Sequence, residues 1–349
     1  MSSNNRIVYV DLLRLLACFS VIVLHTAASS WYTTPVNSFE WQILNLYDGL
    51  VRFCVPVFVM ISGAFLLNPE KQMTLGFLFH KYISRIVLAF VFWSAIYSIS
   101  LNIMKFRSFS AEFLVSVLKD FLIGHYHLWF LFMIFGLYLV SPFLKKITEE
   151  RRLSEYYIFL FLIFGLLIPF LQKSSLFSVT AVLTERMHFH FVLGFSGYFV
   201  IGFFLLTHSI ATWLKVLIYI AGVTGTLATI IFTSLISIAG NTPNEFFYSY
   251  LSPNVAASSI AIFLFFKEKV SRITLPVRLS KSISKLSLCA FGIYLVHDFY
   301  NIALKAVGLT TLSFNPLFSV PIISIIVFLL SLATILLLKR IPLLRRFIM

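Results

Sequence analysis

Three ionisable residues, Asp11, Arg14 and His25, lie within the first long apolar stretch of the chain, from about residue 7 to residue 29. A charged group at the centre of a membrane helix is costly, so such groups are functional candidates by default. Arg14 and His25 are eleven residues apart, about three helical turns, so both should lie on one stripe, with Asp11 about one turn before Arg14. The rise from Arg14 to His25 is roughly 16 Å, about half a bilayer core. This spacing predicts a site for a long ligand.

The chemistry of these side chains points to proton transfer and anion binding. An imidazole has a pKa near 6.5 and can take a proton from a hydroxyl group near neutral pH. A guanidinium is the best bidentate partner for phosphate groups. Two other interpretations stay open: Asp11 and Arg14 could form an ion pair that only fixes helix packing, and His25 could face water at the interface. The alignment of all three on one stripe favours a functional site.

The composition of the chain indicates a membrane protein. Hydrophobic residues make up 60% of it, charged residues make up 11%, and the mean hydropathy is +0.96. A soluble domain carries about 25% charged residues, so we expect an all-α, polytopic membrane protein. No polar stretch is long enough for a separate soluble domain, so residues 1–349 should form a single transmembrane domain. The apolar segments predict about ten membrane-spanning helices: 7–29, 46–67, 83–104, 127–144, 156–171, 191–207, 213–238, 249–266, 286–306 and 317–338.

The distribution of Lys and Arg predicts how the chain crosses the membrane. With a cytoplasmic N-terminus, 19 of these residues fall on the inner side of the ten spans and 6 on the outer side. Cytoplasmic loops are rich in Lys and Arg, so we expect both termini inside, Arg14 in the inner half and His25 near the outer end. The net charge of +14 then reflects topology and attraction to anionic membrane lipids. We expect no nucleic-acid partner, because the cations are dispersed among loops.

Four segments of the chain resemble, in order, the signature motifs of the integral-membrane acyltransferase type 3 family. The opening signature is matched by VDLLRLLAC at residues 10–18, followed by VIVLH at 21–25. The other matches are VPVFVMISG at 55–63, YHLWFL at 126–131 with YLVSP at 138–142, and GIYLVH at 292–297. The pattern is most similar to stand-alone O-acetyltransferases of cell-surface glycans, a group that includes those of the enterobacterial common antigen.

The resemblance implies an acyl donor, usually acetyl-CoA in the cytosol, and a hydroxyl acceptor on a surface polysaccharide or its lipid-linked precursor. It places Arg14 near the donor and gives His25 the role of catalytic histidine, with Asp11 orienting or neutralising Arg14. His25 would act as a base or form a transient acyl-histidine. The expected location is the bacterial cytoplasmic (inner) membrane.

The chain departs from the family pattern in two places. The family tends to carry an arginine pair before the third helix; here Arg85 matches, but its partner position is Tyr82, with Lys81 beside it. Lys81 and Arg85 lie about one turn apart and could clamp donor phosphates together, or could only mark the cytoplasmic side. Many members carry a glutamate in the fourth helix, where Met133 and its neighbours are apolar.

Further candidate residues each have a second, purely structural interpretation. Ser62 could donate to the thioester carbonyl of the donor. His127 and Trp129, at the outer start of the fourth span, could contact a sugar, or Trp129 could only anchor the helix at the interface. His297 and Asp298 lie deep in the ninth span and could contact substrate or pair structurally.

A metal site is not expected from the histidine pattern. The pairs are His125 with His127 and His188 with His190. Residues two apart point to different sides of a helix, and no matching carboxylate or cysteine set is evident. We therefore expect no metal cofactor.

Two other functions remain open. A glycan transporter or exporter often has paired helices broken at Gly or Pro in repeat-related halves. The second span, with Pro56 and Gly63, is a candidate for such a break, but the sequence shows no partner half. A membrane-bound O-acyltransferase of the separate type would use His297 as its catalytic residue.

Overall fold

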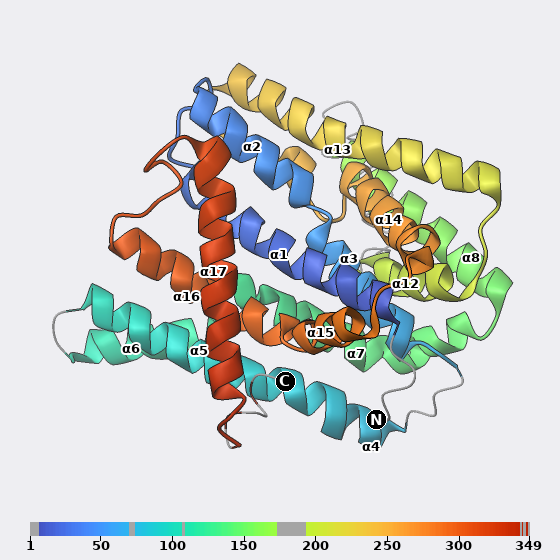
Figure 1. Ribbon diagram of the computed structural model, residues 1–349, viewed down its shortest axis with the longest axis horizontal. Helices are drawn as coiled ribbons and strands as arrows, with labels where there is room; N and C mark the ends of the chain where they lie inside the picture. Colours follow the sequence, from blue (N-terminus) through green and yellow to red (C-terminus); the bar gives the residue numbers. More distant parts are fainter. Residues whose placement is uncertain are drawn as a thin grey trace.

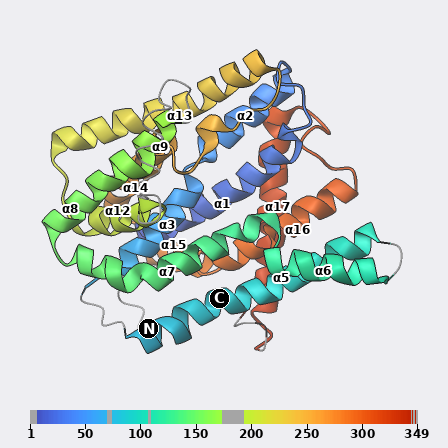
Figure 2. The same ribbon diagram turned by 180° about the vertical axis from the view of Figure 1, so that it is seen from behind.

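The computed structural model describes residues 7–69, 74–106, 109–172, 193–342, 344 and 347. Every regular element in these ranges is a helix, which confirms the all-α prediction. The helix α1 (Val8–Trp31) runs through the middle of the bundle, between α13 (Thr212–Gly240) and α5 (Ser84–Lys105) (Figure 1). The view from behind shows the same central position of α1 (Figure 2).

The central helix is covered by neighbours on most of its surface. Of its 24 residues, 14 are buried, as expected for a helix that is apolar on nearly all sides. The helices that pack against it come from both halves of the chain: α2 (Phe39–Val51), α3 (Cys54–Leu66), α14 (Pro253–Glu268), α15 (Val277–Ser287), α16 (Ala290–Ala306) and α17 (Pro316–Leu338). The residues of α1 are therefore placed to meet side chains that are distant in sequence.

The remaining helical segments include several short or irregular turns. Two of them, η2 and η4, are π-helical, and three are 3₁₀ turns. In chain order these segments are α4 (Leu75–Phe77), η2 (Leu78–Ile83), α6 (Ala111–Ile123), η3 (Tyr126–Leu128), α7 (Trp129–Thr148), α8 (Arg151–Leu160), η4 (Phe161–Leu167), α9 (Ile168–Gln172), α12 (Ser196–Thr207), η6 (Phe246–Tyr248) and η7 (Val270–Arg272).

The described residues contain eight helical segments that are long and apolar enough to cross a membrane. A ninth forms if α15 and α16, which bend by 59° at their junction, count as one span. These nine correspond to nine of the ten predicted spans, so the prediction of a polytopic protein is confirmed. The predicted span 191–207 corresponds to α12, whose 12 residues measure about 18 Å, less than a bilayer core of about 30 Å. Residues 191 and 192 lie outside the described residues.

The second span is broken near its middle. The helix α2 ends at Val51 and α3 begins at Cys54, so Arg52 and Phe53 form a short turn between them. The sequence points to Pro56 for this break, but Pro56 lies in the first turn of α3, where a missing N–H leaves no helical bond unmade. The break therefore precedes the proline.

Gly63 on α3 and Gly202 on α12 allow the backbones of these two helices to come into direct contact. A Cβ atom on Gly63 would lie 2.0 Å from the Phe199 carbonyl oxygen, and one on Gly202 would lie 1.9 Å from the Met60 carbonyl oxygen. Small residues are typical of such close helix pairs in membranes. Gly63 thus fixes the position of α3, which carries Ser62.

Replacing Gly63 with alanine is expected to destabilise the protein, because the added methyl group would overlap the backbone of α12. Overpacking typically costs about 1–3 kcal/mol, and a contact with rigid backbone favours the upper end of that range. Thermal unfolding of the purified protein in detergent micelles measures the effect. Gly136→Ala on α7 is the matched control, because no atom lies within 4 Å of its added Cβ. Equal unfolding temperatures for the two variants would contradict the close approach.

Candidate active site

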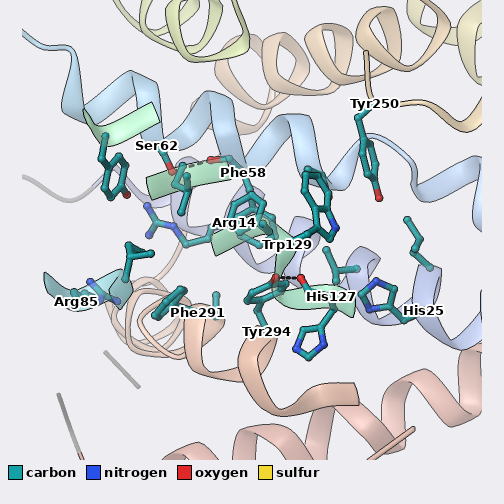
Figure 3. Close-up of a pocket in the computed structure, with 18 of the residues that line it drawn as sticks. Arg14, His25, Phe58, Ser62, Arg85, His127, Trp129, Tyr250, Phe291 and Tyr294 are labelled. Carbon is teal, nitrogen blue, oxygen red and sulfur yellow. Dashed lines mark hydrogen bonds between the residues drawn. The ribbon is translucent and has the colours of Figure 1, made fainter. Parts of the chain in front are cut away.

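One cavity lies alongside α1 and joins the residues that the sequence singled out (Figure 3). Arg14 and Arg85 line one end of it, and His25 and His127 line the other. Between these ends the lining is mostly apolar and aromatic, and it comes from α1, α3, α7 and α16. Because Arg14 and His25 line the same cavity, the prediction that they share one stripe of the first helix is confirmed.

Arg14 is held at its end of the cavity by Asp11 and by α15. Its Nη1 donates to Asp11 Oδ1 at 3.2 Å and to Ser287 Oγ at 3.0 Å. Asp11 also accepts from Ser284 Oγ at 2.7 Å and from Ser287 Oγ at 2.8 Å. Asp11 does not line the cavity and lies roughly 21 Å along α1 from His25, so it can act only through Arg14.

Arg85 lies at the same end, and Lys81 does not. The Arg85 guanidinium lies 5.0 Å from the centroid of the Phe291 ring, and Tyr82 lines the cavity beside it. The Lys81 ammonium lies 4.7 Å from the centroid of the Phe77 ring, outside the cavity lining. The two residues therefore do not both contribute to the cavity lining, where Tyr82 of the π-helical turn η2 lies beside Arg85 instead.

Ser62 lines the cavity on α3, at the Arg14 end (Figure 3). Its Oγ donates to the Phe58 carbonyl oxygen at 3.0 Å. The hydroxyl hydrogen is therefore already used, and Ser62 can accept a hydrogen bond more readily than it can donate one to a ligand carbonyl.

His25 forms a hydrogen-bonded chain with His297. Its Nδ1 lies 2.6 Å from His297 Nε2, and His297 Nδ1 lies 2.6 Å from the Tyr294 carbonyl oxygen. A carbonyl oxygen can only accept, so Nδ1 of His297 carries the proton, and a neutral His297 accepts at Nε2 from Nδ1–H of His25. In a neutral His25 the unprotonated ring nitrogen is therefore Nε2. That is the tautomer with an acceptor available for a substrate proton.

His125 and His127 lie beside this chain, on the connection between α6 and α7. His125 is extended and His127 lies in the 3₁₀ turn η3, so their Nδ1 atoms are only 2.9 Å apart. The two side chains therefore do not point to different sides, as they would in an α-helix, and that part of the prediction against a metal site is wrong. A matching carboxylate is also present: Asp298 Oδ2 lies 3.5 Å from His125 Nδ1. The other pair, His188 and His190, lies outside the described residues.

The four predicted substrate-contacting residues divide into two groups. His127 and Trp129 line the cavity, whereas His297 and Asp298 are buried outside its lining. Trp129 stacks on Tyr250, with ring centroids 5.8 Å apart and planes inclined by 20°, and Tyr250 also lines the cavity. The His25 end of the cavity therefore has a flat aromatic wall.

A buried ion pair that the sequence-based predictions do not include lies next to this wall. Arg52 Nε lies 2.6 Å from Asp48 Oδ1, and Arg52 Nη2 donates to Asp48 Oδ2 at 2.8 Å. The guanidinium lies 4.0 Å from the centroid of the Tyr248 ring and 5.8 Å from that of Tyr250. The signal was present, because both residues are ionisable and lie in an apolar span, the criterion that singled out Arg14.

Comparison with known proteins gives one match. Residues 7–339 match the acyltransferase type 3 family, which is described as an acyltransferase domain. No curated protein and no solved structure matches the chain. The matched range covers nearly the whole sequence and contains Arg14, Arg85 and His25. The chain therefore belongs to the acyltransferase type 3 family.

Proposed function

We propose that this membrane acyltransferase is an O-acetyltransferase that moves an acetyl group from cytosolic acetyl-CoA to a hydroxyl group of a cell-surface polysaccharide or its lipid-linked precursor. The observation that carries the proposal is the cavity that joins two arginines to His25. The rise along α1 from Arg14 to His25 is roughly 16 Å. One linear donor can therefore place its phosphates at one end and its reactive carbonyl at the other.

The Arg14 end of the cavity suits the phosphate groups of CoA. Arg14 and Arg85 both line it, and guanidinium groups bind phosphates bidentately. In the orientation predicted from the Lys and Arg distribution, this end opens toward the cytosol. The apolar middle of the cavity suits the thin pantetheine arm that links the phosphates to the thioester.

The His25 end suits the transfer step. His25 Nε2 takes the proton of the acceptor hydroxyl while the hydroxyl oxygen attacks the thioester carbon. The tetrahedral intermediate then collapses: the C–S bond breaks, the CoA thiolate leaves, and His25 returns the proton to it. His297 and the Tyr294 carbonyl hold the imidazole in the required tautomer and stabilise the positive charge that develops on it.

A glycan is the acceptor that fits the outer end. Trp129 and Tyr250 offer a stacked aromatic surface on which the apolar face of a sugar ring can pack. The predicted orientation turns this end toward the outside of a bacterial inner membrane. The similarity of the motifs to O-acetyltransferases of surface glycans, including those of the enterobacterial common antigen, supports this class of acceptor.

Acetyl-CoA labelled in its acetyl group tests the proposal directly. The protein in lipid nanodiscs, supplied with this donor and with lipid-linked glycans, should transfer label to the saccharide as a base-labile ester. NMR of surface glycans from cells with and without the gene should show O-acetyl groups only in the first. Failure to bind acetyl-CoA together with unchanged glycan acetylation would contradict the proposal. That result would favour a glycan exporter, which has no use for acetyl-CoA.

A further inference from the structure

We propose that His125, His127 and Asp298 bind a divalent transition metal ion, with Zn²⁺ as the ion whose ligand chemistry they fit. Neither the sequence pattern nor the family match points to this site. It lies between the α6–α7 connection and α16, next to His25 but separate from the arginine end of the cavity. It does not depend on which acyl group or acceptor the protein uses.

The three ligand atoms are already close to a metal-binding arrangement. One ligand atom from each residue lies within 4.8 Å of the other two. The two Nδ1 atoms are 2.9 Å apart, and Asp298 Oδ2 lies 3.5 Å from His125 Nδ1. Zn–N and Zn–O bonds of about 2.0–2.1 Å in a tetrahedron separate neighbouring ligand atoms by about 3.3 Å. The two observed separations bracket that value, so binding needs only small side-chain movements.

Neighbouring side chains fix the orientation of the Asp298 carboxylate and of the His125 ring. Asp298 Oδ1 accepts from Tyr126 Oη at 2.8 Å and from Asn301 Nδ2 at 3.3 Å, which leaves Oδ2 facing His125. The Tyr97 ring stacks on His125, with centroids 4.5 Å apart and planes inclined by 14°. Such outer contacts orient the ligands of protein metal sites and raise their affinity.

The charge of Asp298 gives an independent reason for a cation here. The residue is only 4% exposed, and a buried carboxylate needs a positive partner. Its basic neighbours in the described ranges are histidines alone: His125 at 3.5 Å, with nitrogens of His25 and His297 within 4.8 Å. Without a metal ion, a single proton lies between the two Nδ1 atoms, and the Asp298 carboxylate faces the same His125 nitrogen. A divalent ion would satisfy all three acceptors at once.

A second group of three, His25, His297 and Asp298, is a weaker candidate. Its ligand atoms also lie within 4.8 Å of one another. However, both nitrogens of His297 already have hydrogen-bond partners, His25 on one side and the Tyr294 carbonyl on the other. The ion is therefore assigned to the first group, where the side chain of His125 is 12% exposed and gives access from the surface.

Titration of the full-length protein with Zn²⁺ tests the site. The protein in detergent micelles is treated with EDTA, freed of it by dialysis, and titrated with zinc chloride, with the bound metal measured by mass spectrometry. We expect one Zn²⁺ per chain and a higher unfolding temperature with zinc, since the ion binds the folded state. His125→Ala should lose both effects, while His80→Ala, which changes an exposed histidine outside the cluster, should keep both.

Tyr126→Phe separates metal binding from folding, because it keeps all three ligands and removes only the hydrogen bond to Asp298. It is expected to remain folded without zinc and to bind zinc about 10-fold more weakly. X-ray absorption of the zinc-loaded wild type should show two imidazole nitrogens and a carboxylate oxygen around the metal. Zinc binding that is no stronger in the wild type than in His125→Ala would overturn the proposal, as would an unchanged affinity in Tyr126→Phe.

Discussion

Replacing His25 with alanine is expected to lower kcat for acyl transfer by about 10²–10⁴-fold, because the reaction loses the base that takes the acceptor proton. The KM for acetyl-CoA should change little, since the donor phosphates bind at the far end of the cavity. Steady-state rates of the purified variant with labelled acetyl-CoA measure both quantities. Added imidazole should restore part of the rate by occupying the space that the missing ring leaves. An unchanged rate in a folded variant would remove His25 from the mechanism.

His297 provides the matched comparison for His25. Its contact with His25 Nδ1 predicts that His297→Ala lowers kcat by a smaller factor than His25→Ala, because the base remains but its tautomer is no longer fixed. In His297→Gln the amide oxygen can accept from His25 Nδ1–H, so part of this loss should be recovered. If instead both His297 variants lose as much activity as His25→Ala, His297 is the catalytic residue, as in the separate membrane-bound O-acyltransferase type.

The stripe on the first helix could be predicted because it depends on a single regular element. Arg14 and His25 are separated by about three turns of one α-helix, so their alignment follows from helical geometry alone. The contact of Asp11 with Arg14 is equally local, at 3.2 Å across three residues. Their partners Ser284, Ser287 and His297 come from α15 and α16, more than 250 residues later, and no periodicity in α1 indicates them.

Predictions failed where the local helix was not α-helical or not continuous. His125 and His127 converge because their connection is an extended residue followed by a 3₁₀ turn, not an α-helix. The break in the second span lies at Arg52, where a charged side chain pairs with Asp48, rather than at Pro56. Such irregular turns depend on tertiary packing, which apolar patterning of a membrane helix does not encode.

Replacing Arg14 with alanine is expected to weaken acetyl-CoA binding by about 10–100-fold, because a hydrogen bond to a charged group contributes about 1.5–3 kcal/mol. At saturating acetyl-CoA, kcat should fall much less than the affinity does, since His25 and the stacked rings of Trp129 and Tyr250 stay in place. Arg14→Lys keeps the charge but loses the bidentate geometry, so its affinity should lie between those of the wild type and Arg14→Ala. Donor titration by calorimetry, followed by initial rates, measures each effect.

The choice of donor distinguishes phosphate binding from a general structural effect of the same substitution. Acetyl-pantetheine carries the thioester but lacks the nucleotide phosphates, so its KM should be the same for the wild type and Arg14→Ala. Removing Arg14 also leaves Asp11, whose side chain is 10% exposed, with Ser284 and Ser287 as its hydrogen-bonding side chains in the described part of the chain, so unfolding temperatures must accompany the kinetics. Equal weakening of acetyl-CoA and acetyl-pantetheine would show that Arg14 shapes the cavity without holding a phosphate. Arg85, whose guanidinium lies against the Phe291 ring at the same end of the cavity, would then be the candidate that binds the donor phosphates.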